Sequence, residues 1–291
     1  MARILITGAA GNLGGKLVAH WRQTSGHDLV LLDRRAGDGV HEGDISVFDP
    51  EWAGLLEGVD AVFHLAGDIR PVARWEEVHP ANVVGAANVL RAAKAAGVKR
   101  VVFASTNQVM GGHRFRTETI RSDSPPLPLN PYAVSKLIGE EMGRAFVAET
   151  GADFIAFRIG KIWPGDNLAG PDLGIGSWGQ EMGLSNRDFV HAMDCAVTAA
   201  PMGFGIFNLV SNNPGMRWDI EPARRLLASL SDREREVVAL IGQGMSNAEI
   251  GSALHLSEAT VKGYVSAVLG KIGAVNRVQA ALVAYRGGLI A

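Results

Sequence analysis

The pattern of apolar residues changes near residue 225, and this change constrains the fold more than any other feature of the chain. Before it, short apolar runs alternate with helix-length segments; from Ser231 onward only short helical stretches follow one another. The apolar runs cover Arg3–Thr7, Asp28–Leu32, Ala61–Leu65, Arg100–Ala104, Asp153–Arg158 and Ile206–Val210. Nearly continuous apolar strands separated by helices are typical of a parallel sheet covered on both faces.

Helices are predicted over Gly14–Thr24, Asn82–Ala96 and Pro131–Thr150, between the apolar runs. With 291 residues, 47% of them hydrophobic, the chain can bury one large core and one small core. The predicted fold is therefore α/β, a doubly wound parallel sheet over residues 1–228, followed by a small all-α domain over 229–291. Residues 159–190 are rich in Gly, Pro and Trp, which predicts loops beside a substrate site. Residues 226–230 lack Gly and Pro, which favours a continuous helix or a tight junction over a flexible tether.

Composition limits the classes of protein and partner. The net charge of −2 includes no basic tail that would attract nucleic acid in bulk. The single cysteine, Cys195, excludes an intrachain disulfide and a cysteine-only metal site, and it fits a reducing compartment. No metal site is predicted. The first strand begins at Arg3, which leaves no room for a signal peptide, and no run of eighteen apolar residues occurs. We expect a cytoplasmic protein without membrane contact.

A glycine-rich turn follows the first strand. The segment Thr7-Gly8-Ala9-Ala10-Gly11-Asn12-Leu13-Gly14 leads directly into a predicted helix. Such glycines allow the backbone N–H groups, including those of Asn12 and Leu13, to approach a pyrophosphate at the helix N-terminus. Asp33 ends the next strand, where a carboxylate accepts hydrogen bonds from both ribose hydroxyls and repels a 2′-phosphate. The pattern predicts NAD as cofactor; NADP is less favoured but stays open, because Arg34 and Arg35 follow Asp33.

Tyr132 and Lys136 lie four residues apart and therefore share one face of the helix predicted over Pro131–Thr150. An ammonium about 4 Å from a phenol, at an effective dielectric constant near 20, contributes roughly 4 kcal/mol, or at most about three pKa units. We expect the lysine to lower the tyrosine's pKa, so that the phenolate removes a hydroxyl proton while hydride leaves for the cofactor.

The glycine spacing together with Tyr132-Ala133-Val134-Ser135-Lys136 resembles the extended short-chain dehydrogenase/reductase family. The resemblance covers about residues 1–225 and is to the NAD-dependent epimerase/dehydratase branch, with a uronate-dehydrogenase-like character. It implies a Rossmann-type fold and the catalytic set Thr106, Tyr132 and Lys136. Further cofactor contacts implied by the resemblance are Asp44, Ile45, Leu65, Ala66 and Gly67, and Asn82 is expected to open a long helix.

The substrate is less well specified. Asn107 and Gln108 are candidate contacts to substrate hydroxyls, and Arg158 is a further candidate, although an arginine at a strand end is more often structural. Uronate-type relatives carry an arginine that binds the substrate carboxylate. The nearest equivalent in this chain is Trp178, whose aromatic face suits a neutral sugar or polyol. Trp178 could equally be a packing residue. We expect a sugar-like small molecule, and the choice between dehydrogenase, epimerase and dehydratase stays open.

Four helical stretches, about 232–241, 246–254, 257–270 and 275–286, are predicted in the C-terminal part. The segments Ser246-Asn247-Ala248-Glu249-Ile250 and Thr260-Val261-Lys262 resemble the DNA-binding domain of LuxR-type regulators. The resemblance implies a helix-turn-helix with 257–270 as recognition helix and 275–286 as dimerising helix. Residue spacing agrees: Ser257 is placed to cap a helix whose apolar stripe is Val261, Val265, Val268, Leu269 and Ile272.

The opposite face of the predicted recognition helix carries only small side chains, namely Ala259, Gly263, Ser266, Ala267 and Gly270. Small residues read few base edges. Lys262 and Lys271 flank this face and are placed for phosphates, and Thr260 and Ser266 complete the predicted contacts. We predict a homodimer that binds double-stranded DNA with modest sequence specificity.

Three functions are compatible with these motifs. The first is an NAD-dependent oxidoreductase or epimerase/dehydratase acting on a sugar-like hydroxyl and carrying a DNA-binding module. The second is a transcriptional regulator whose dehydrogenase-like domain senses NAD(H) or a sugar metabolite. The third is an uncoupled gene fusion or chimera. The Thr106, Tyr132 and Lys136 set favours the first, because sensing requires no proton transfer.

Overall fold

The computed structural model describes residues 1–37, 39–167, 176–199, 201–219, 231–272, 274, 276–286 and 289, with the side chains of Gly270, Lys271, Leu282 and Arg286 outside the description. The chain divides into two compact units. The α/β unit is Met1–Met193 with Pro201–Trp218, and the helical unit is Asp194–Ala200 with Asp219–Ala291. The predicted domain boundary at 228/229 and the predicted junction at 226–230 lie outside the described residues.

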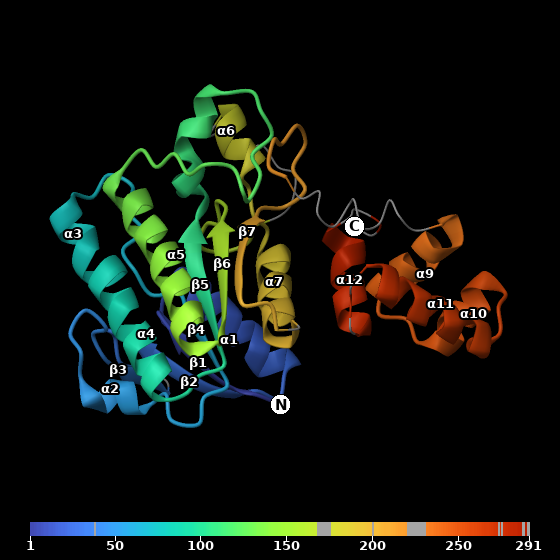
Figure 1. Ribbon diagram of the computed structural model, residues 1–291, viewed down its shortest axis with the longest axis horizontal. Helices are drawn as coiled ribbons and strands as arrows, with labels where there is room; N and C mark the ends of the chain where they lie inside the picture. Colours follow the sequence, from blue (N-terminus) through green and yellow to red (C-terminus); the bar gives the residue numbers. More distant parts are fainter. Residues whose placement is uncertain are drawn as a thin grey trace. The chain divides into compact units, whose positions relative to one another are not determined.

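A parallel sheet of seven strands forms the centre of the α/β unit, in the order β3-β2-β1-β4-β5-β6-β7 (Figure 1). The strands are β1 (Arg3–Thr7), β2 (Asp28–Asp33), β3 (Val40–Glu42), β4 (Ala61–His64), β5 (Arg100–Thr106), β6 (Asp153–Ile159) and β7 (Phe204–Leu209). Six of them correspond to the predicted apolar runs. The edge strand β3 was not predicted, because three residues are too few to show a pattern.

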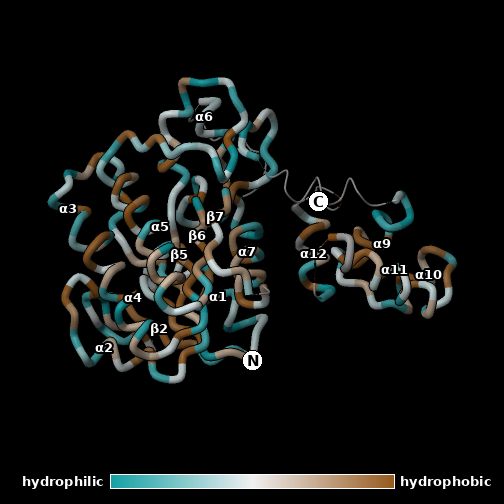
Figure 2. Tube along the Cα trace, in the orientation of Figure 1, coloured by the Kyte–Doolittle hydropathy of each residue, from teal (hydrophilic) through white to brown (hydrophobic). Residues whose placement is uncertain are grey.

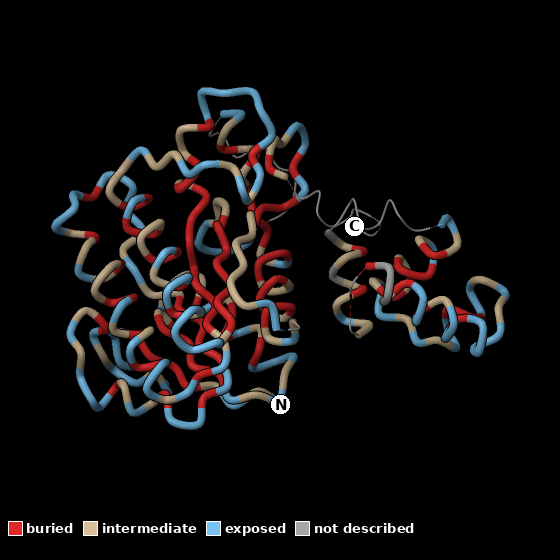
Figure 3. Tube along the Cα trace, in the orientation of Figure 1, coloured by how far each residue is buried: buried red, intermediate tan, exposed pale blue. Residues whose placement is uncertain are grey.

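Helices cover both faces of this sheet (Figure 1). They are α1 (Asn12–Thr24), α2 (Pro50–Gly54), α3 (Trp75–His79), the π-helix η1 (Pro80–Val84), α4 (Gly85–Ala95), the 3₁₀ segment η2 (Asn107–Phe115), α5 (Pro131–Thr150), α6 (Gly176–Glu181) and α7 (Asn186–Thr198). On one face, Ala86 and Val89 of α4 pack with Leu5 and Val62 of the sheet. On the other, Trp21 of α1 meets Phe63 edge-on, with ring centroids 5.0 Å apart. The buried strands between these layers are visible in Figure 3.

The prediction that Asn82 opens a long helix is wrong. Helical backbone begins seven residues earlier, at Trp75, and Asn82 lies within η1. Pro80 supplies no N–H, and it is accommodated as the first residue of the π segment. A sequence pattern with period 3.6 does not reveal such a segment, so the earlier start was missed.

Helix α5 lies close against the strands that it covers because two of its glycines have no side chain. A Cβ on Gly139 would come within 2.3 Å of the Phe103 ring, and one on Gly143 within 2.2 Å of the Phe154 ring. Left-handed Gly151, with φ of +69°, ends the helix. This packing fixes the helix that carries Tyr132 and Lys136 relative to the ends of β5 and β6.

The helical unit contains α9 (Asp232–Gly242), α10 (Asn247–Leu254), α11 (Glu258–Lys271) and α12 (Arg277–Arg286). These confirm the predicted stretches to within two residues at each end. Reciprocal serine–glutamate hydrogen bonds cap α9, through Ser231 and Glu234, and α10, through Ser246 and Glu249. Of the predicted apolar stripe, Val261, Val265, Val268 and Ile272 are buried in the core with α9, α10 and α12, and Leu269 is partly buried against it. Figure 2 shows apolar positions on all four helices. Among the described residues, no helix is both long and apolar enough to cross a bilayer.

Candidate functional site

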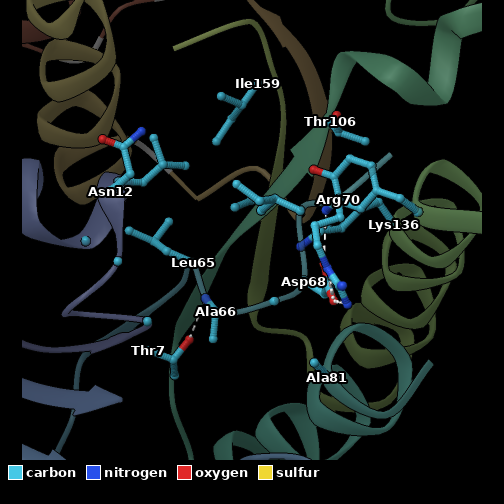
Figure 4. A pocket seen from close by; sticks show the side chains of 18 of the residues that line it. Thr7, Asn12, Leu65, Ala66, Asp68, Arg70, Ala81, Thr106, Lys136 and Ile159 are labelled. Atoms are coloured by element: carbon cyan, nitrogen blue, oxygen red, sulfur yellow. Dashed lines mark hydrogen bonds and ion pairs between the residues drawn. The ribbon is translucent and has the colours of Figure 1, made fainter. Parts of the chain in front are cut away.

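A pocket of about 880 Å³ opens at the carboxyl ends of the strands of the α/β unit (Figure 4). Such crevices are where ligands bind in open parallel sheets. It brings together every residue that the sequence predicts as a catalytic or cofactor contact: Gly8, Gly11, Asn12, Leu13, Gly14, Asp33, Asp44, Ile45, Leu65, Ala66, Gly67, Thr106, Tyr132 and Lys136. The side chains come from segments far apart in the sequence, which the parallel topology places along one edge.

The glycine turn is shaped to leave helix N–H groups open to a ligand. Gly8 has φ of +72°, and a Cβ on Gly14 would come within 2.1 Å of the Gly8 carbonyl oxygen. Gly11 is the N-cap of α1, and no side chain caps this helix. The amide groups at the start of α1 therefore remain available to an anion, and the helix dipole favours one there.

Asp33 is held at the end of β2 beside this turn. Its carboxylate accepts hydrogen bonds from the backbone N–H groups of Ala10, at 3.0 Å, and Arg35, at 3.1 Å. The Arg35 guanidinium donates to the Ala10 carbonyl at 2.7 Å and lies 3.6 Å from Asp33 Oδ1. Asp33 lines the pocket at the end of its strand, and a carboxylate at this strand end is the group that hydrogen-bonds the ribose in dinucleotide sites of this kind.

The remaining cofactor positions are formed by loops after β3 and β4. A hydrogen bond from Ser46 to Asp44 holds the pKa of that carboxyl below its usual value. Ala66 donates its N–H to Thr7 Oγ1 at 3.3 Å, and Gly67 has φ of +153°, where a Cβ would come within 2.8 Å of Asn82 Oδ1. These features, with the uncapped α1 and the Asp33 carboxylate, fit a bound dinucleotide.

Thr106, Tyr132 and Lys136 are all nearly inaccessible to solvent, at 4%, 8% and 3% exposure. Thr106 ends β5, where its Oγ1 accepts the Gln108 N–H at 3.2 Å, and Pro131 and the Asn130 cap start α5 just before Tyr132. The Lys136 ammonium lies 5.0 Å from the centroid of the Phe103 ring. Burial lowers the pKa of Lys136 to about 8.

The structure corrects the expected direction of the tyrosine's shift. Burial raises the pKa of Tyr132, a hydrogen bond with Thr106 opposes this, and the charge of Asp68 raises it further. The desolvation of the phenolate outweighs the attraction expected from the lysine. The positive nicotinamide ring of NAD⁺, when bound, would be a further cause that lowers the pKa of Tyr132.

The predicted substrate residues fall into two groups. Asn107 and Gln108 line the pocket, and Gln108 Oε1 accepts a hydrogen bond from Asn130 at 2.8 Å. Trp178 does not belong to the described lining of the pocket; its ring packs on that of Trp218, with centroids 5.6 Å apart. The tertiary packing thus favours the alternative of Trp178 as a packing residue.

Several polar residues of this region were not predicted. Asp68 and Arg70 line the pocket, and Glu140 forms a fully buried ion pair with Arg158 at 2.8 Å. Ser105 donates to the same Glu140 carboxylate at 2.6 Å. The position of Arg158 in this pair agrees with the structural alternative for that residue. Glu140 follows Lys136 by four residues, a spacing that could have indicated their shared helix face.

Helix α11 of the helical unit presents a second candidate surface. Ser257 Oγ accepts the Thr260 N–H at 3.1 Å and so caps the helix as predicted, and His255, with φ of 54°, forms the tight turn before it. Thr260, Lys262 and Ser266 are exposed, as are Ala259, Gly263 and Ala267. The predicted contacts of the Lys271 side chain lie outside the described residues.

Comparison with known proteins agrees with both resemblances. Residues 4–163 match the NAD dependent epimerase/dehydratase family, and residues 228–284 match the family described as bacterial regulatory proteins, luxR family. The L-arabinose 1-dehydrogenase (NAD(P)(+)) of Haloferax volcanii is 34% identical over 73% of this chain and 89% of its own. The uronate dehydrogenase of Pseudomonas syringae pv. tomato is 32% identical over 77% of this chain and 80% of its own.

Solved structures show the same relationship. A mutated uronate dehydrogenase superposes with a TM-score of 0.65 at 30% identity, covering 75% of this chain and 77% of that chain. A mutant uronate dehydrogenase from Agrobacterium tumefaciens, complexed with NAD, has a TM-score of 0.63 at 26% identity, covering 75% and 80%. NAD is accordingly the cofactor, and the C-terminal part is a luxR-type helix-turn-helix domain. The chain belongs to the NAD dependent epimerase/dehydratase family and is an NAD-dependent oxidoreductase of the short-chain dehydrogenase type.

Proposed function

We propose that the α/β unit is a sugar dehydrogenase that oxidises the anomeric hydroxyl of an aldose with NAD⁺, and that Thr106, Tyr132 and Lys136 carry the chemistry. The observation that supports this most strongly is the meeting of these three buried side chains with the glycine turn in one pocket. The intact set favours an enzyme over a pure sensor or an uncoupled fusion, since neither of these needs a proton acceptor.

In this proposal Thr106 Oγ1 hydrogen-bonds the substrate oxygen, and the Tyr132 oxygen removes its proton. The glycine turn and Asp33 would hold NAD⁺, which would supply the hydride acceptor for the carbon that bears this oxygen, so that a C=O bond would replace the C–H and O–H bonds. Lys136 stabilises the phenolate, and its lowered pKa of about 8 lets it change protonation near neutral pH. Asn107 and Gln108 contact hydroxyl groups of the sugar.

The sugar class is supported by the relatives. Their names include L-arabinose 1-dehydrogenase, uronate dehydrogenase and NAD-dependent glucose-6-phosphate dehydrogenase. All three names describe dehydrogenation of a sugar or a sugar derivative, and the first specifies C1. This favours dehydrogenation over epimerisation or dehydration for this chain.

For residues 229–291 we propose a domain that binds double-stranded DNA as a homodimer, with α11 in the major groove. Lys262 and Lys271 would contact phosphates, and Thr260 and Ser266 would face the bases. The exposure of Thr260, Lys262 and Ser266 and the match to the luxR family support the proposal. A protein that uses NAD and binds DNA would work in the cytoplasm.

The test incubates the full-length protein and NAD⁺ with each member of a panel of aldoses, uronates, sugar phosphates and nucleotide sugars. The absorbance of NADH measures the reduction of NAD⁺. We expect turnover with at least one free aldose or aldose derivative, and a lactone as the product. Turnover only with nucleotide sugars, or none with any sugar, would refute the proposed reaction. Gel shifts with random-sequence duplex DNA at low salt test the helical unit separately.

A further inference from the structure

An ion pair lies in the pocket beside the catalytic set and takes no part in the proposed chemistry. Arg70 Nε lies 3.0 Å from both carboxylate oxygens of Asp68, and Arg70 Nη2 lies 2.5 Å from Asp68 Oδ2. Both side chains line the pocket. Figure 4 shows them on the side where Thr106 and Lys136 lie, with Asn12 on the opposite side. The pair therefore faces the part of the pocket where the reacting end of a substrate would lie.

The backbone of Asp68 is held in place by a buried side chain. Asn82, itself 1% exposed, accepts the Asp68 N–H at 2.7 Å and donates to the Asp68 carbonyl at 2.9 Å. The same Asn82 amide donates to Ser135 Oγ at 2.9 Å, and Ser135 donates to the Tyr132 carbonyl at 2.7 Å. Asp68 and the catalytic helix α5 are thus fixed by one buried amide. Such preorganisation is what a recognition site requires.

The charges of this cluster do not favour an anion. The guanidinium of Arg70 is shared between Asp68 and Glu77, whose Oε1 lies 3.3 Å from Arg70 Nη1. Glu77 is also paired with Arg74, whose Nε lies 3.5 Å from Glu77 Oε2, but Arg74 lies outside the described lining of the pocket. Within that lining, Asp68 and Glu77 share the guanidinium of Arg70. The Arg70 hydrogen bond keeps the pKa of Asp68 low, so this carboxylate is ionised near neutral pH, and its charge reaches Tyr132. A carboxylate or phosphate on the substrate would be repelled, whereas a hydroxyl can donate to Asp68 while its neighbour accepts from Arg70.

We propose that the Asp68–Arg70 pair is the sugar-recognition element of this pocket and binds two adjacent hydroxyls of an uncharged aldose, in preference to a uronate or a sugar phosphate. This inference rests on the proposed function and specifies its substrate class. Lys161 also lines the pocket, with its ammonium 3.7 Å from the centroid of the Trp163 ring. A preference for anionic sugars would assign recognition to Lys161 instead.

The experiment measures kcat/KM of the full-length protein with L-arabinose, D-galactose and D-glucose, and with D-galacturonate, D-glucuronate and glucose 6-phosphate. We expect the parent to favour the neutral sugars. Asp68→Asn and Arg70→Gln should each lower kcat/KM for the neutral sugars at least about tenfold, mainly through KM, the scale of a lost hydrogen bond to a charged group. Asp68→Asn should also shift the neutral-to-uronate ratio toward the uronate by a similar factor, because it removes the repelling charge.

A matched control is the Arg121–Asp123 pair, which is likewise two residues apart in sequence, lies outside the described lining of the pocket and is joined at 2.9 Å. Arg121→Gln and Asp123→Asn should leave kcat/KM for the neutral sugars and the neutral-to-uronate ratio unchanged. NAD⁺ affinity, measured by fluorescence, should be the same in all four variants. The inference is overturned if the parent prefers a uronate or sugar phosphate, or if Asp68→Asn leaves the ratio unchanged. Failure of the parent to oxidise any sugar would instead overturn the proposed function.

Discussion

The two units of this protein expose the side chains of their proposed sites in opposite ways. In the α/β unit Thr106, Tyr132 and Lys136 are at most 8% exposed, and each has neighbours that restrict its position. On α11 of the helical unit, Thr260, Lys262 and Ser266 lie exposed, whereas the apolar stripe of that helix is largely buried. A proton-transfer site needs low solvent access to shift pKa values, whereas a surface that binds DNA must remain open to it. The difference teaches that burial distinguishes the two kinds of site.

The first way to break this comparison is to remove one unit. Deletion of residues 228–291 should abolish DNA binding completely in gel shifts, because the exposed face of α11 is lost. NAD⁺ affinity and sugar oxidation should remain close to those of the full chain. A truncated protein that still shifts DNA would show that the assignment of DNA binding to the helical unit is wrong.

The second concerns the buried set itself. Tyr132→Phe should lower turnover by about 10² to 10⁴, the range for loss of a general acid or base, while NAD⁺ binding is retained. Tyr264→Phe, the same change on α11, is the control and should leave turnover unaltered. Turnover by Tyr132→Phe at the parental rate would exclude the proposed mechanism. DNA binding should be unaffected by Tyr132→Phe.

The third tests what burial of the lysine costs. The pKa of Lys136 is about 8, below its usual 10.5, so between these values the unfolded chain binds more protons and stability rises with pH. Below about pH 8 both states are protonated and the full destabilisation applies. Lys136→Met should therefore raise the free energy of unfolding at neutral pH by up to about 3 kcal/mol. It should also abolish the increase in stability with pH. Urea titrations at about pH 7 and about pH 9.5 measure both effects. The control Lys94→Met, at an exposed lysine, should change neither the stability at neutral pH nor its dependence on pH. Equal stability of Lys136→Met and the parent at neutral pH would contradict the prediction.

The fourth sharpens the cofactor side. Asp33→Ala should weaken NAD⁺ binding by roughly tenfold, the scale of a hydrogen bond to a charged group. It should also reduce the preference for NAD⁺ over NADP⁺. In the parent, Arg35 lies 3.6 Å from the Asp33 carboxylate, and in the variant its charge is free to attract the 2′-phosphate of NADP⁺. Asp28→Ala, at the exposed start of the same strand, serves as the control. A parent protein that prefers NADP⁺ in fluorescence titrations would remove the role given to Asp33.

The smallest effect is expected on the exposed face. Lys262→Ala should weaken DNA binding a few-fold and equally for all sequences, and it should reduce the log–log salt slope by about one. Lys99→Ala makes the same charge change on the α/β unit and should alter neither. Strong discrimination between DNA sequences by the parent would show that the small side chains of α11 read bases better than we expect.

Local sequence patterns were sufficient for most elements and for predicting the glycine turn and Asp33 of the pocket, whereas its other cofactor contacts were predicted from the family resemblance. Six strands, the helix Pro131–Thr150 and all four helices of the helical unit were predicted, because each has a clear apolar period or a cap. The three-residue strand β3 and the π segment at Pro80–Val84 were not, because their backbone conformation depends on neighbours. Tyr132 and Lys136 were predicted through their spacing, which one helix turn sets by itself, whereas Thr106 was predicted only from the family resemblance.

Tertiary structure alone decided the direction of the Tyr132 pKa, the packing of Trp178 on Trp218, and the place of the Asp68–Arg70 pair in the pocket. The sequence by itself determined that strands alternate with helices, that glycines leave the start of α1 open, and that Tyr132 and Lys136 share a face. These properties depend on residues within one or two turns of each other. Burial and ion pairing in the pocket depend on segments such as Asp68, Asn82 and Ser135, which only the folded sheet brings within hydrogen-bond distance. Desolvation and Coulomb interactions act through space, so their balance is set when the chain is folded.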